Sequence, residues 1–398
     1  MNLICIADTR FPIERANGVQ TMATCHALAL RGHSVRLVTR SDTSAPPRDA
    51  FEFYGVLPTS HLRLEPIATP KGASLRRATF LLGALRVATT SDADVVFTRD
   101  LGLASFLLQI PAAHRPPVVY ESHGVSVTVS KEMPTLLGQP GLEPSAAKLR
   151  RLDRREHRVW RKAASYVTIT RALADELTKT YGPRERLFVV PDGAAPLDRG
   201  QVTKNDKVVF RDLTPPVAAY AGHLYPWKGV DVFVRALALA PGLRGLIVGG
   251  HPGEADLARV EKVAREAGVT DRLTITGLVP PRDVTRYLAQ ADVLVLPNTP
   301  SAISERYTSP LKLFEYLTLG KPTVASDLPS IREILTHDAN ALLVPPGDAP
   351  ALAAALTRVT HDAALAGRLG AAALALSADY TWDRRAERLE AALMAATA

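Results

Sequence analysis

The segment Val293–Ser326, VLVLPNTPSAISERYTSPLKLFEYLTLGKPTVAS, contains two apolar runs separated by a helical pattern. The runs Val293–Leu296 and Thr323–Ala325 are short and apolar throughout, as strands buried on both faces of a parallel sheet are. Between them, a helix is predicted to begin near Thr308, where small polar residues and Pro310 precede an amphipathic stretch. A strand, a helix and a second strand in this order predict one unit of a parallel α/β sheet.

The same alternation of apolar strands and helical patterns covers the rest of the chain. In the first half, the strand candidates are Leu3–Ala7, Ser34–Thr39, Val95–Thr98, Val118–Glu121, Tyr166–Thr170 and Leu187–Val190. In the second half, the pattern restarts with Val217–Gly222, Arg244–Val248 and Leu273–Thr276. Turn formers and charged residues replace periodic apolar residues between residues 191 and 216, so we predict two consecutive doubly wound α/β domains.

We place the first domain at residues 1–195 and the second at residues 196–375. The Ala- and Leu-rich tail keeps helical spacing, and we expect residues 376–398 to contain a final helix, Trp382–Ala396. Two domains agree with a length of 398 residues.

The predicted helix near Thr308 carries chemistry suited to a nucleotide diphosphate. A helix N-terminus offers free N–H groups and a partial positive charge to an anion. Lys312 and Glu315 follow on one helical face. The carboxylate of Glu315 can accept hydrogen bonds from both hydroxyls of a ribose. The alternative interpretation is an ordinary amphipathic helix on which Glu315 is solvated.

The composition is that of a globular protein, with 46% apolar and 22% charged residues. No apolar run approaches the ~20 residues that cross a bilayer, and Leu3–Ala7 is too short for a signal peptide core. Cys5 and Cys25 lack Cys-x-x-Cys spacing and have apolar neighbours. We therefore expect reduced thiols, no structural disulfide and a cytoplasmic protein.

The net charge of +8 lies entirely in the first half of the chain. Residues 1–200 hold 27 basic against 19 acidic residues, whereas residues 201–398 hold 21 of each. Much of the excess lies in Lys148–Lys162, and a second basic and apolar stretch runs from Leu75 to Arg86. These stretches suit peripheral contact with an anionic membrane or an anionic acceptor. The alternative is two amphipathic helices with Arg-rich exposed faces. Without a reading motif or aromatic platform, nucleic acid is not expected as a partner.

Ligands of open parallel sheets bind beyond the carboxyl ends of the strands. In the first half, Gly18 follows the first strand, where a missing side chain allows close approach, and His123 ends the strand at Val118–Glu121. In the second half, His223 and Lys228 follow a strand ending in Gly and can converge on phosphates. The backbone near Val279 follows another strand and can edge a flat base.

Read in order, the motifs of the second half resemble those of the retaining glycosyltransferases of family 4. The matching pieces are Gly222-His223-Leu224, Trp227-Lys228-Gly229, Leu246–Gly250, Gly277–Val279, Ala291–Val293 with Leu296-Pro297, and Glu315 with Gly320–Ser326. The first half agrees through Gly18, Arg31–Val35, Glu121–Gly124 and Val190–Gly193. The resemblance spans nearly the whole chain and implies the GT-B fold, in which two Rossmann-like doubly wound domains face a central cleft. It also implies that the C-terminal helix of residues 376–398 crosses back to the first domain.

The resemblance implies a site and a mechanism. Lys228 and the N–H groups near Thr308, Ser309 and Leu311 would hold the donor diphosphate, and Glu315 would bind the ribose. His123 would contact the donor sugar near the reacting carbon, which makes His123, Lys228 and Glu315 the principal catalytic residues. Donor contacts are also implied at Gly18, His223, Val279, Tyr307 and Lys312. The sugar would keep its anomeric configuration without a protein nucleophile, through positioning and electrostatic stabilisation.

Two positions depart from the family pattern. Tyr307 stands where the family usually has a Glu that contacts the donor sugar, and either Glu305 or Arg306 could substitute for it. His223 stands where an Arg usually binds phosphate, and Lys312 replaces an apolar residue and restores a positive charge.

The function we expect is transfer of a hexose-type sugar from a UDP- or GDP-sugar to a hydroxyl of a glycan, lipid-linked or envelope precursor, as in polysaccharide biosynthesis. We expect no cofactor and no metal, because the pair Asp92 and Asp94 alone makes an incomplete metal site. The cytoplasmic protein would contact the inner membrane face peripherally. The alternatives are a GT-B-fold sugar-nucleotide epimerase or hydrolase, and a non-catalytic nucleotide- or polyanion-binding protein.

Overall fold

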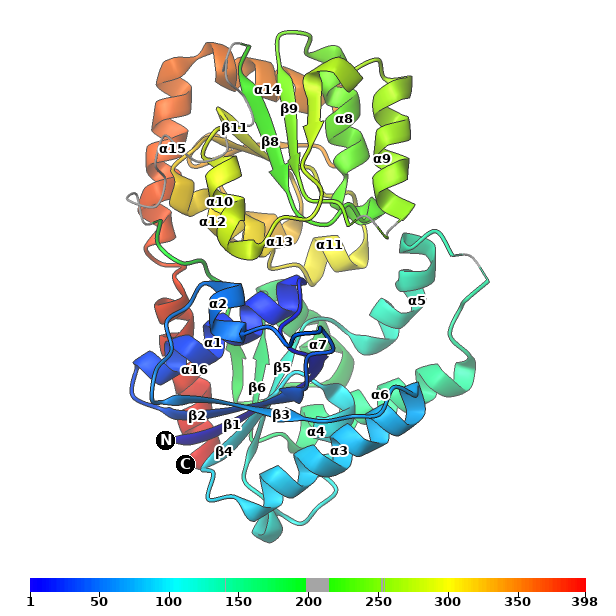
Figure 1. Cartoon of the computed structure of the whole chain (residues 1–398), viewed down its shortest axis with the longest axis vertical. Coiled ribbons are helices and arrows are strands. Elements are labelled where there is room, and N and C mark those ends of the chain that lie inside the picture. The colour runs from blue at the N-terminus through cyan, green and yellow to red at the C-terminus, as the bar shows by residue number, and fades with distance from the viewer. Residues whose placement is uncertain (140, 198–214, 252, 254) are drawn as a thin grey trace. The chain divides into compact units, whose positions relative to one another are not determined.

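The computed structural model describes residues 1–139, 141–197, 215–251, 253 and 255–398. They form two compact units, each built around one sheet whose strand pairs are all parallel (Figure 1). Unit 1 comprises Met1–Lys131, Glu143–Asp192 and Trp382–Ala398, and unit 2 comprises Glu132–Leu142 and Gly193–Thr381. The prediction of an α/β protein with two doubly wound sheets is confirmed.

The sheet of unit 1 has seven strands in the order β3-β2-β1-β4-β5-β6-β7. The strands are β1 (Asn2–Arg10), β2 (Ser34–Arg40), β3 (Leu62–Ile67), β4 (Val95–Thr98), β5 (Val118–Ser122), β6 (Ser165–Thr168) and β7 (Leu187–Val189). The helices are α1 (Ala16–Leu30), α2 (Ala50–Tyr54), α3 (Ala73–Thr90), α4 (Leu101–Leu107), α6 (Ala146–Lys162), α7 (Arg171–Tyr181) and α16 (Trp382–Thr397), with a short 3-10 helix η1 (Ala112–His114). Helix α5 (Ser126–Leu136) begins in unit 1, and its residues from Glu132 onward belong to unit 2.

The described part of unit 2 has a six-stranded sheet in the order β10-β9-β8-β11-β12-β13. The strands are β8 (Val217–Ala221), β9 (Arg244–Val248), β10 (Leu273–Ile275), β11 (Val293–Leu296), β12 (Thr323–Ser326) and β13 (Leu342–Val344). The helices are α8 (Val230–Leu239), α9 (Ala255–Glu266), α10 (Pro281–Leu288), α11 (Ala302–Arg306), α12 (Leu311–Leu319), α13 (Pro329–Arg332), α14 (Ala349–His361) and α15 (Ala363–Ser377), with the 3-10 helices η2 (Pro226–Lys228) and η3 (Thr270–Arg272).

Both sheets reverse their winding direction next to their first strand. In unit 1 the switch lies between β1 and β4, and in unit 2 it lies between β8 and β11. Crevices at such switch points, beyond the carboxyl ends of the strands, are where open α/β sheets bind ligands. The loops after these four strands are therefore the places where the fold directs functional side chains.

Helix α16 packs on the sheet of unit 1, although unit 2 separates it in sequence from the rest of that unit. Its buried face contributes Ala386, Leu389, Ala392, Leu393 and Ala396 to the hydrophobic core that also contains Leu3, Val95 and Val167. Each of the side chains Leu389 and Leu393 is 0% exposed, so burial in a packed core holds the helix in place.

Several helices of both units begin with a polar residue that satisfies a free backbone N–H. The side chains of Asp100, Ser145 and Thr170 accept from Leu103, Lys148 and Leu173 N at the starts of α4, α6 and α7. Asp348 does the same for α14, through Ala351 N at 2.8 Å. These N-caps explain why the helices begin where they do.

Candidate active site

The loop after β8 is held against the end of β11 at the switch point of unit 2. Gly229 has φ of +69°, and a Cβ at this position would lie 1.7 Å from the carbonyl oxygen of Pro297. The backbone N–H of Thr299 donates to the carbonyl oxygen of Trp227 at 3.1 Å. Only glycine permits this approach. The contact therefore fixes the position of the residue between Trp227 and Gly229, which is Lys228.

Glycines also shape the loops at the carboxyl edge of the unit 2 sheet. Gly222 directly follows β8 with φ of +140°, and Gly249 follows β9 with φ of +147°. A Cβ at Gly249 would lie 2.0 Å from the carbonyl oxygen of Gly222. Glycine at these positions therefore lets the loops after β8 and β9 approach each other closely.

Helix α12 is tied to the same switch point by a buried tyrosine. The Tyr316 hydroxyl accepts from Ala221 N at 2.9 Å, at the end of β8, and donates to the carbonyl oxygen of Val295 in β11 at 3.4 Å. At the N-terminal end, the Thr308 hydroxyl donates to the carbonyl oxygen of Ile303 at 2.7 Å. These bonds orient the backbone N–H groups at the start of α12.

The predicted phosphate-binding residues at the start of α12 differ in exposure. Tyr307 is 3% exposed and Thr308 is 8% exposed, whereas Ser309 is half-buried. Leu311, the first residue of α12, is also buried. The backbone N–H groups, rather than the side chains of Tyr307 and Leu311, are therefore the groups that this segment can offer to a ligand.

Two lysines and one glutamate form the charged centre of unit 2. The Lys312 ammonium lies 2.9 Å from Glu315 Oε2, and both side chains are about a quarter exposed. Lys228 is half-buried. Burial, and then the positive charge of Lys312, lower the pKa of Lys228 to about 8. Two cations beside one carboxylate leave a net positive charge, which favours an anionic ligand.

His223 belongs to a stack of three aromatic rings along the loop after β8. Its ring lies parallel to that of Tyr225 with centroids 5.0 Å apart, and Tyr225 stacks on Trp227 at 4.7 Å. This stacking fixes the orientation of the His223 imidazole within the loop that also carries Lys228. Val279 follows β10, is half-buried and packs against the core that contains Val284 and Leu288. Glu305 and Arg306 form the last turn of α11.

In unit 1, the position of Gly18 differs from the expectation. Helix α1 begins at Ala16, so Gly18 lies in its first turn instead of in a loop. A Cβ at Gly18 would lie 2.3 Å from the Tyr54 hydroxyl and 2.8 Å from the carbonyl oxygen of Ile13. Tyr54 and the chain at Ile13 fill the space beside this glycine, so its missing side chain is required for packing within unit 1.

His123 lies at the carboxyl end of β5, as predicted, and has a buried acidic partner. Its Nε2 is 2.6 Å from Oε1 of Glu121, which is 1% exposed. Burial, and then the nearby charge of Arg99, lower the pKa of His123 to about 4 despite this contact. The pKa of Glu121 lies far below its usual range, because the charge of Arg385 and the hydrogen bond from His123 outweigh the cost of burial. At neutral pH the pair is therefore a neutral imidazole beside a carboxylate.

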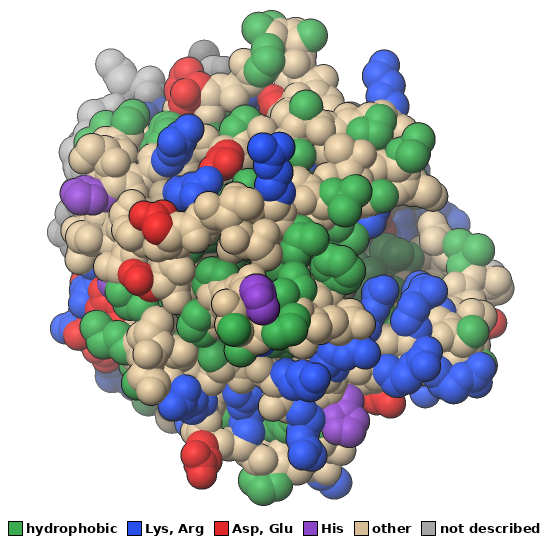
Figure 2. Space-filling model, turned by 90° about the horizontal axis from the view of Figure 1, so that it is seen from below, with side chains coloured by type: hydrophobic (Ala, Val, Ile, Leu, Met, Phe, Trp, Pro, Cys, Tyr) green, Lys and Arg blue, Asp and Glu red, His purple; other side chains and the backbone are tan. Residues whose placement is uncertain are grey.

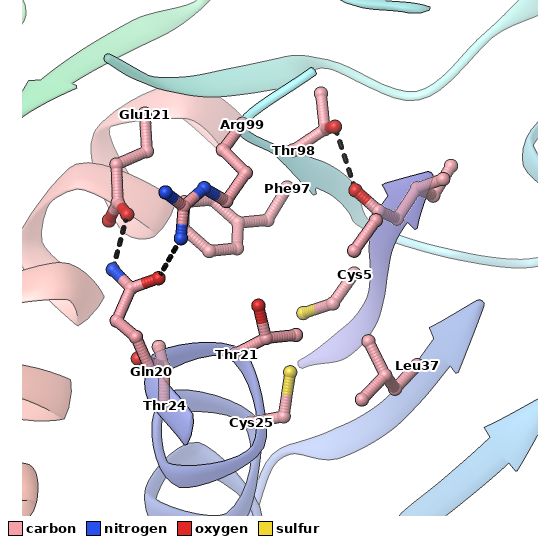
Figure 3. A pocket seen from close by; sticks show the side chains of 12 residues that line it. Cys5, Gln20, Thr21, Thr24, Cys25, Leu37, Phe97, Thr98, Arg99 and Glu121 are labelled. Carbon is pink, nitrogen blue, oxygen red and sulfur yellow. Dashed lines mark hydrogen bonds between the residues drawn. The ribbon is translucent and has the colours of Figure 1, made fainter. Parts of the chain in front are cut away.

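The residues around this pair were not identified from the sequence. Gln20, in α1, donates to Glu121 Oε1 at 2.7 Å and accepts from Arg99, which follows β4 (Figure 3). They line a cavity of about 20 Å³, room for about one water molecule, together with Thr24 and Cys25. Arg99 directly follows the predicted strand that became β4, so its position at a strand end could have identified it as a candidate site residue. Gln20 could not be identified in this way, because its partners Arg99 and Glu121 lie 79 and 101 residues away in the sequence.

The basic stretch Lys148–Lys162 lies on helix α6, which has one buried face and one exposed face. Val159 and Trp160 are buried in unit 1, and the Trp160 indole donates to the carbonyl oxygen of Gly182 at 3.1 Å. The exposed face carries Lys148, Arg150, Arg151, Arg154, Arg161 and Lys162. Figure 2 shows basic side chains gathered on the side of unit 1 where α3 and α6 lie in Figure 1.

Three further features bear on earlier expectations. Asp94 Oδ2 accepts from Asn2 N at 2.7 Å, and no His, Cys, Asp or Glu cluster suited to a metal occurs among the described residues. Cys5 and Cys25 are buried free thiols. In the described part of the chain, no helix has both the length and the apolar character to span a membrane.

Comparison with known proteins places the chain in a family. A model of the "glycosyl transferase 4-like domain" matches residues 17–193, and one of "glycosyl transferases group 1" matches residues 215–362. The chain belongs to the family 4 glycosyltransferases. This family consists of transferase enzymes with the GT-B fold, so the predicted resemblance is confirmed.

Named relatives include the D-inositol 3-phosphate glycosyltransferase of Nocardia farcinica, 31% identical over 249 residues, which are 59% of this chain and 53% of the relative. The alpha-D-kanosaminyltransferase of Streptomyces kanamyceticus is 26% identical over 284 residues, 69% of each chain. The match to the Nocardia enzyme thus spans only about half of that relative's length.

Solved structures agree over the whole chain. Anabaena HepE in complex with UDP and glucose is 17% identical, with a TM-score of 0.75 and 99% of both chains covered. Sucrose-phosphate synthase from Thermosynechococcus elongatus is 19% identical, with a TM-score of 0.75 and 98% of both chains covered. At these identities the likeness establishes the fold.

Proposed function

We propose that this protein is a retaining glycosyltransferase that moves a hexose-type sugar from a UDP- or GDP-sugar to a hydroxyl of a carbohydrate or lipid-linked acceptor. The observation that carries the proposal is the charged centre of unit 2, in which Lys312 pairs with Glu315 and its charge acts on Lys228, at the switch point where α12 begins. HepE, a structural neighbour, has been solved with UDP-glucose.

In this proposal, unit 2 holds the nucleotide. Lys228 neutralises the diphosphate, and the N–H groups at the start of α12 bind its oxygens. His223 adds a hydrogen bond to phosphate, and the backbone near Val279 borders the base. Glu315 accepts hydrogen bonds from the ribose hydroxyls. To do so, the Glu315 carboxylate gives up part of its contact with Lys312 when the nucleotide binds.

Catalysis would rest on charge stabilisation as the glycosidic bond breaks. The diphosphate leaves with negative charge, which Lys228 and the start of α12 stabilise more strongly than they stabilise the intact donor. The acceptor hydroxyl attacks from the face that the nucleotide leaves, and its proton passes to the departing diphosphate. The new bond thus forms with retained anomeric configuration, and His123 of unit 1 contacts the transferred sugar. We expect no metal, because the two lysines supply the positive charge.

We further propose that the basic face of α6 contacts anionic lipid, which would place the enzyme peripherally on the cytoplasmic side of a membrane. Because Val159 and Trp160 are already buried in unit 1, the contact is electrostatic and not an insertion of the helix. Co-sedimentation with vesicles containing 30% phosphatidylglycerol tests this, with binding expected to weaken as salt increases. A variant with Arg150, Arg151 and Arg154 replaced by Gln should stay in solution, and unaltered co-sedimentation would contradict the contact.

Product analysis tests the transferase assignment. The protein is incubated with UDP-glucose or another UDP- or GDP-sugar, with and without a mixture of hydroxyl acceptors, and the products are followed by NMR. We expect nucleotide release that depends on acceptor and an α-linked product from an α-linked donor. A β-linked product would contradict retention. Free sugar or an epimerised donor without acceptor would instead indicate the hydrolase or epimerase.

A further inference from the structure

A buried carboxylate next to the predicted catalytic histidine is fully engaged. Oε1 of Glu121 accepts from Gln20 Nε2 at 2.7 Å and lies 2.6 Å from His123 Nε2. Oε2 accepts from Arg385 Nη2 at 2.5 Å. Glu121 and Arg385 are each 1% exposed. A carboxylate so enclosed keeps its charge only because its partners are in place.

Arg385 reaches this carboxylate from the first turn of α16 and also joins two other segments of unit 1. Its Nε donates to the Thr24 hydroxyl in α1 at 3.0 Å. Its Nη1 donates to the carbonyl oxygens of Val190 and Pro191 after β7, at 2.8 and 3.0 Å. A planar guanidinium with this many fixed bonds has one available orientation, so it determines where the Glu121 carboxylate lies.

The charge state of Glu121 then decides which nitrogen of His123 carries the proton. An ionised carboxylate can only accept, so Nε2 of His123 must be the donor in their contact. The positive charge of Arg99 disfavours a second proton on the imidazole of His123. The ring therefore carries one proton, on Nε2, and among the described residues its Nδ1 makes no hydrogen bond. The His123 side chain is 23% exposed, so Nδ1 can be reached.

We propose that Glu121 and Arg385 are positioning residues that hold His123 as the neutral Nε2–H tautomer, so that Nδ1 accepts a hydrogen bond from a hydroxyl of the transferred sugar. The sugar contact rests on the proposed function, whereas the tautomer is a property of the free protein. The C-terminal helix thereby contributes to the substrate specificity of unit 1: a sugar lacking the hydroxyl that meets Nδ1 would leave that acceptor without a partner.

The tautomer is measured first, on the unaltered protein. The chain is labelled with ¹⁵N-histidine, and long-range ¹H–¹⁵N spectra are recorded between pH 6 and 8, with His123→Ala used to assign the ring. We expect a protonated Nε2 and an unprotonated Nδ1 throughout this range. A ring protonated on Nδ1, or on both nitrogens at pH 7, would overturn the proposal whether or not the protein proves to be a transferase.

The positioning role is tested with Glu121→Gln, which keeps the shape of the side chain and removes its charge. Because the Gln amide can donate as well as accept, we expect both tautomers of His123 in the spectra. We also expect kcat to fall at least tenfold while KM for the donor changes less than threefold. Arg385→Lys keeps the charge but loses the planar guanidinium with its several hydrogen bonds. We expect its kcat to lie between those of the unaltered protein and Glu121→Gln.

Arg31→Gln is the matched control, because Arg31 also pairs with α16, through Glu390 and Asp383, but does not touch Glu121. If Arg31→Gln lowers kcat as much as Glu121→Gln does, the effect is a general loosening of α16 and the positioning role is wrong. Unchanged tautomer and kcat in Glu121→Gln would also overturn it. If His123→Ala transfers sugar at the full rate, the predicted sugar contact at Nδ1 fails.

Discussion

At the scale of single residues, charge is set by the neighbours of each group. Lys228 and His123 both have a lowered pKa because burial and a nearby cation disfavour the protonated form. The outcomes differ because the starting values differ: near neutral pH, Lys228 remains mostly charged, whereas His123 is neutral. The proposed roles follow from this contrast, since a diphosphate needs the charge and a sugar hydroxyl needs the free lone pair.

The lowered pKa of Lys228 predicts pH-dependent nucleotide binding. Lys228 is charged below about pH 8 and loses its proton above it, so affinity for a nucleotide diphosphate should fall as pH rises through this value. A bound anion favours the charged lysine, which moves the loss to higher pH in the complex. The dissociation constant of UDP or GDP is measured between about pH 7 and 9.

Lys228→Arg is the control, because a guanidinium stays charged over this range. We expect its affinity to vary less with pH than that of the unaltered protein. Constant affinity in the unaltered protein, or an equal decline in Lys228→Arg, would argue against Lys228 as the titrating group at the diphosphate.

At the scale of elements, the buried hydroxyl of Tyr316 ties α12 to β8 and β11. Tyr316→Phe leaves the Ala221 N–H buried without its partner, so we expect the free energy of unfolding to fall by about 1–3 kcal/mol. Urea denaturation measures it. Tyr287→Phe in α10 is the control, because the structure shows no hydrogen bond of that hydroxyl among the described residues. Equal stability of Tyr316→Phe and the unaltered protein would contradict the tether.

The elements that could be predicted are those in which the pattern of apolar residues in the sequence matches the pattern of buried residues in the structure. Buried strands such as β4 and β5 begin with runs of apolar residues and were found within about a residue of their ends. Strand β3 was missed because it lies at the sheet edge, is mostly only partly buried and contains Pro66. Strand β13, Leu342–Val344, was also missed.

The candidate site was predictable only where its residues lie next to strand ends or at a helix start. Local context located His123, Lys228 and Glu315. Arg385 could not be found in this way, because its bond to Glu121 joins residues 264 positions apart. The crowding by Tyr54 that explains Gly18 is likewise a long-range contact.

At the scale of the whole molecule, the described part of unit 1 includes the C-terminal end of the chain. Leu393 of α16 is 0% exposed in the core of unit 1, whereas its neighbour Met394 is 57% exposed. Leu393→Ala should lower the free energy of unfolding by about 2–5 kcal/mol, because it removes buried methyl groups and leaves a cavity. Chemical denaturation followed by circular dichroism gives the value.

Met394→Ala is the matched control on the same helix, one residue further along, and should change stability by less than about 0.5 kcal/mol. If the two variants are equally stable, α16 is not held by the apolar core of unit 1 in solution.

The central claim is that unit 2 binds a nucleotide diphosphate through Lys228 and Glu315. It is tested most directly by calorimetric titration of the unaltered protein, Glu315→Ala and Lys228→Ala with UDP, GDP, ADP and dTDP, without added metal. We predict binding of UDP or GDP that is weakened about 10- to 100-fold in Glu315→Ala, as expected for loss of hydrogen bonds to a charged group. Lys228→Ala should weaken the diphosphate more than the matching nucleoside. Binding of none of the four nucleotides, or equal affinity in all three proteins, would contradict the claim.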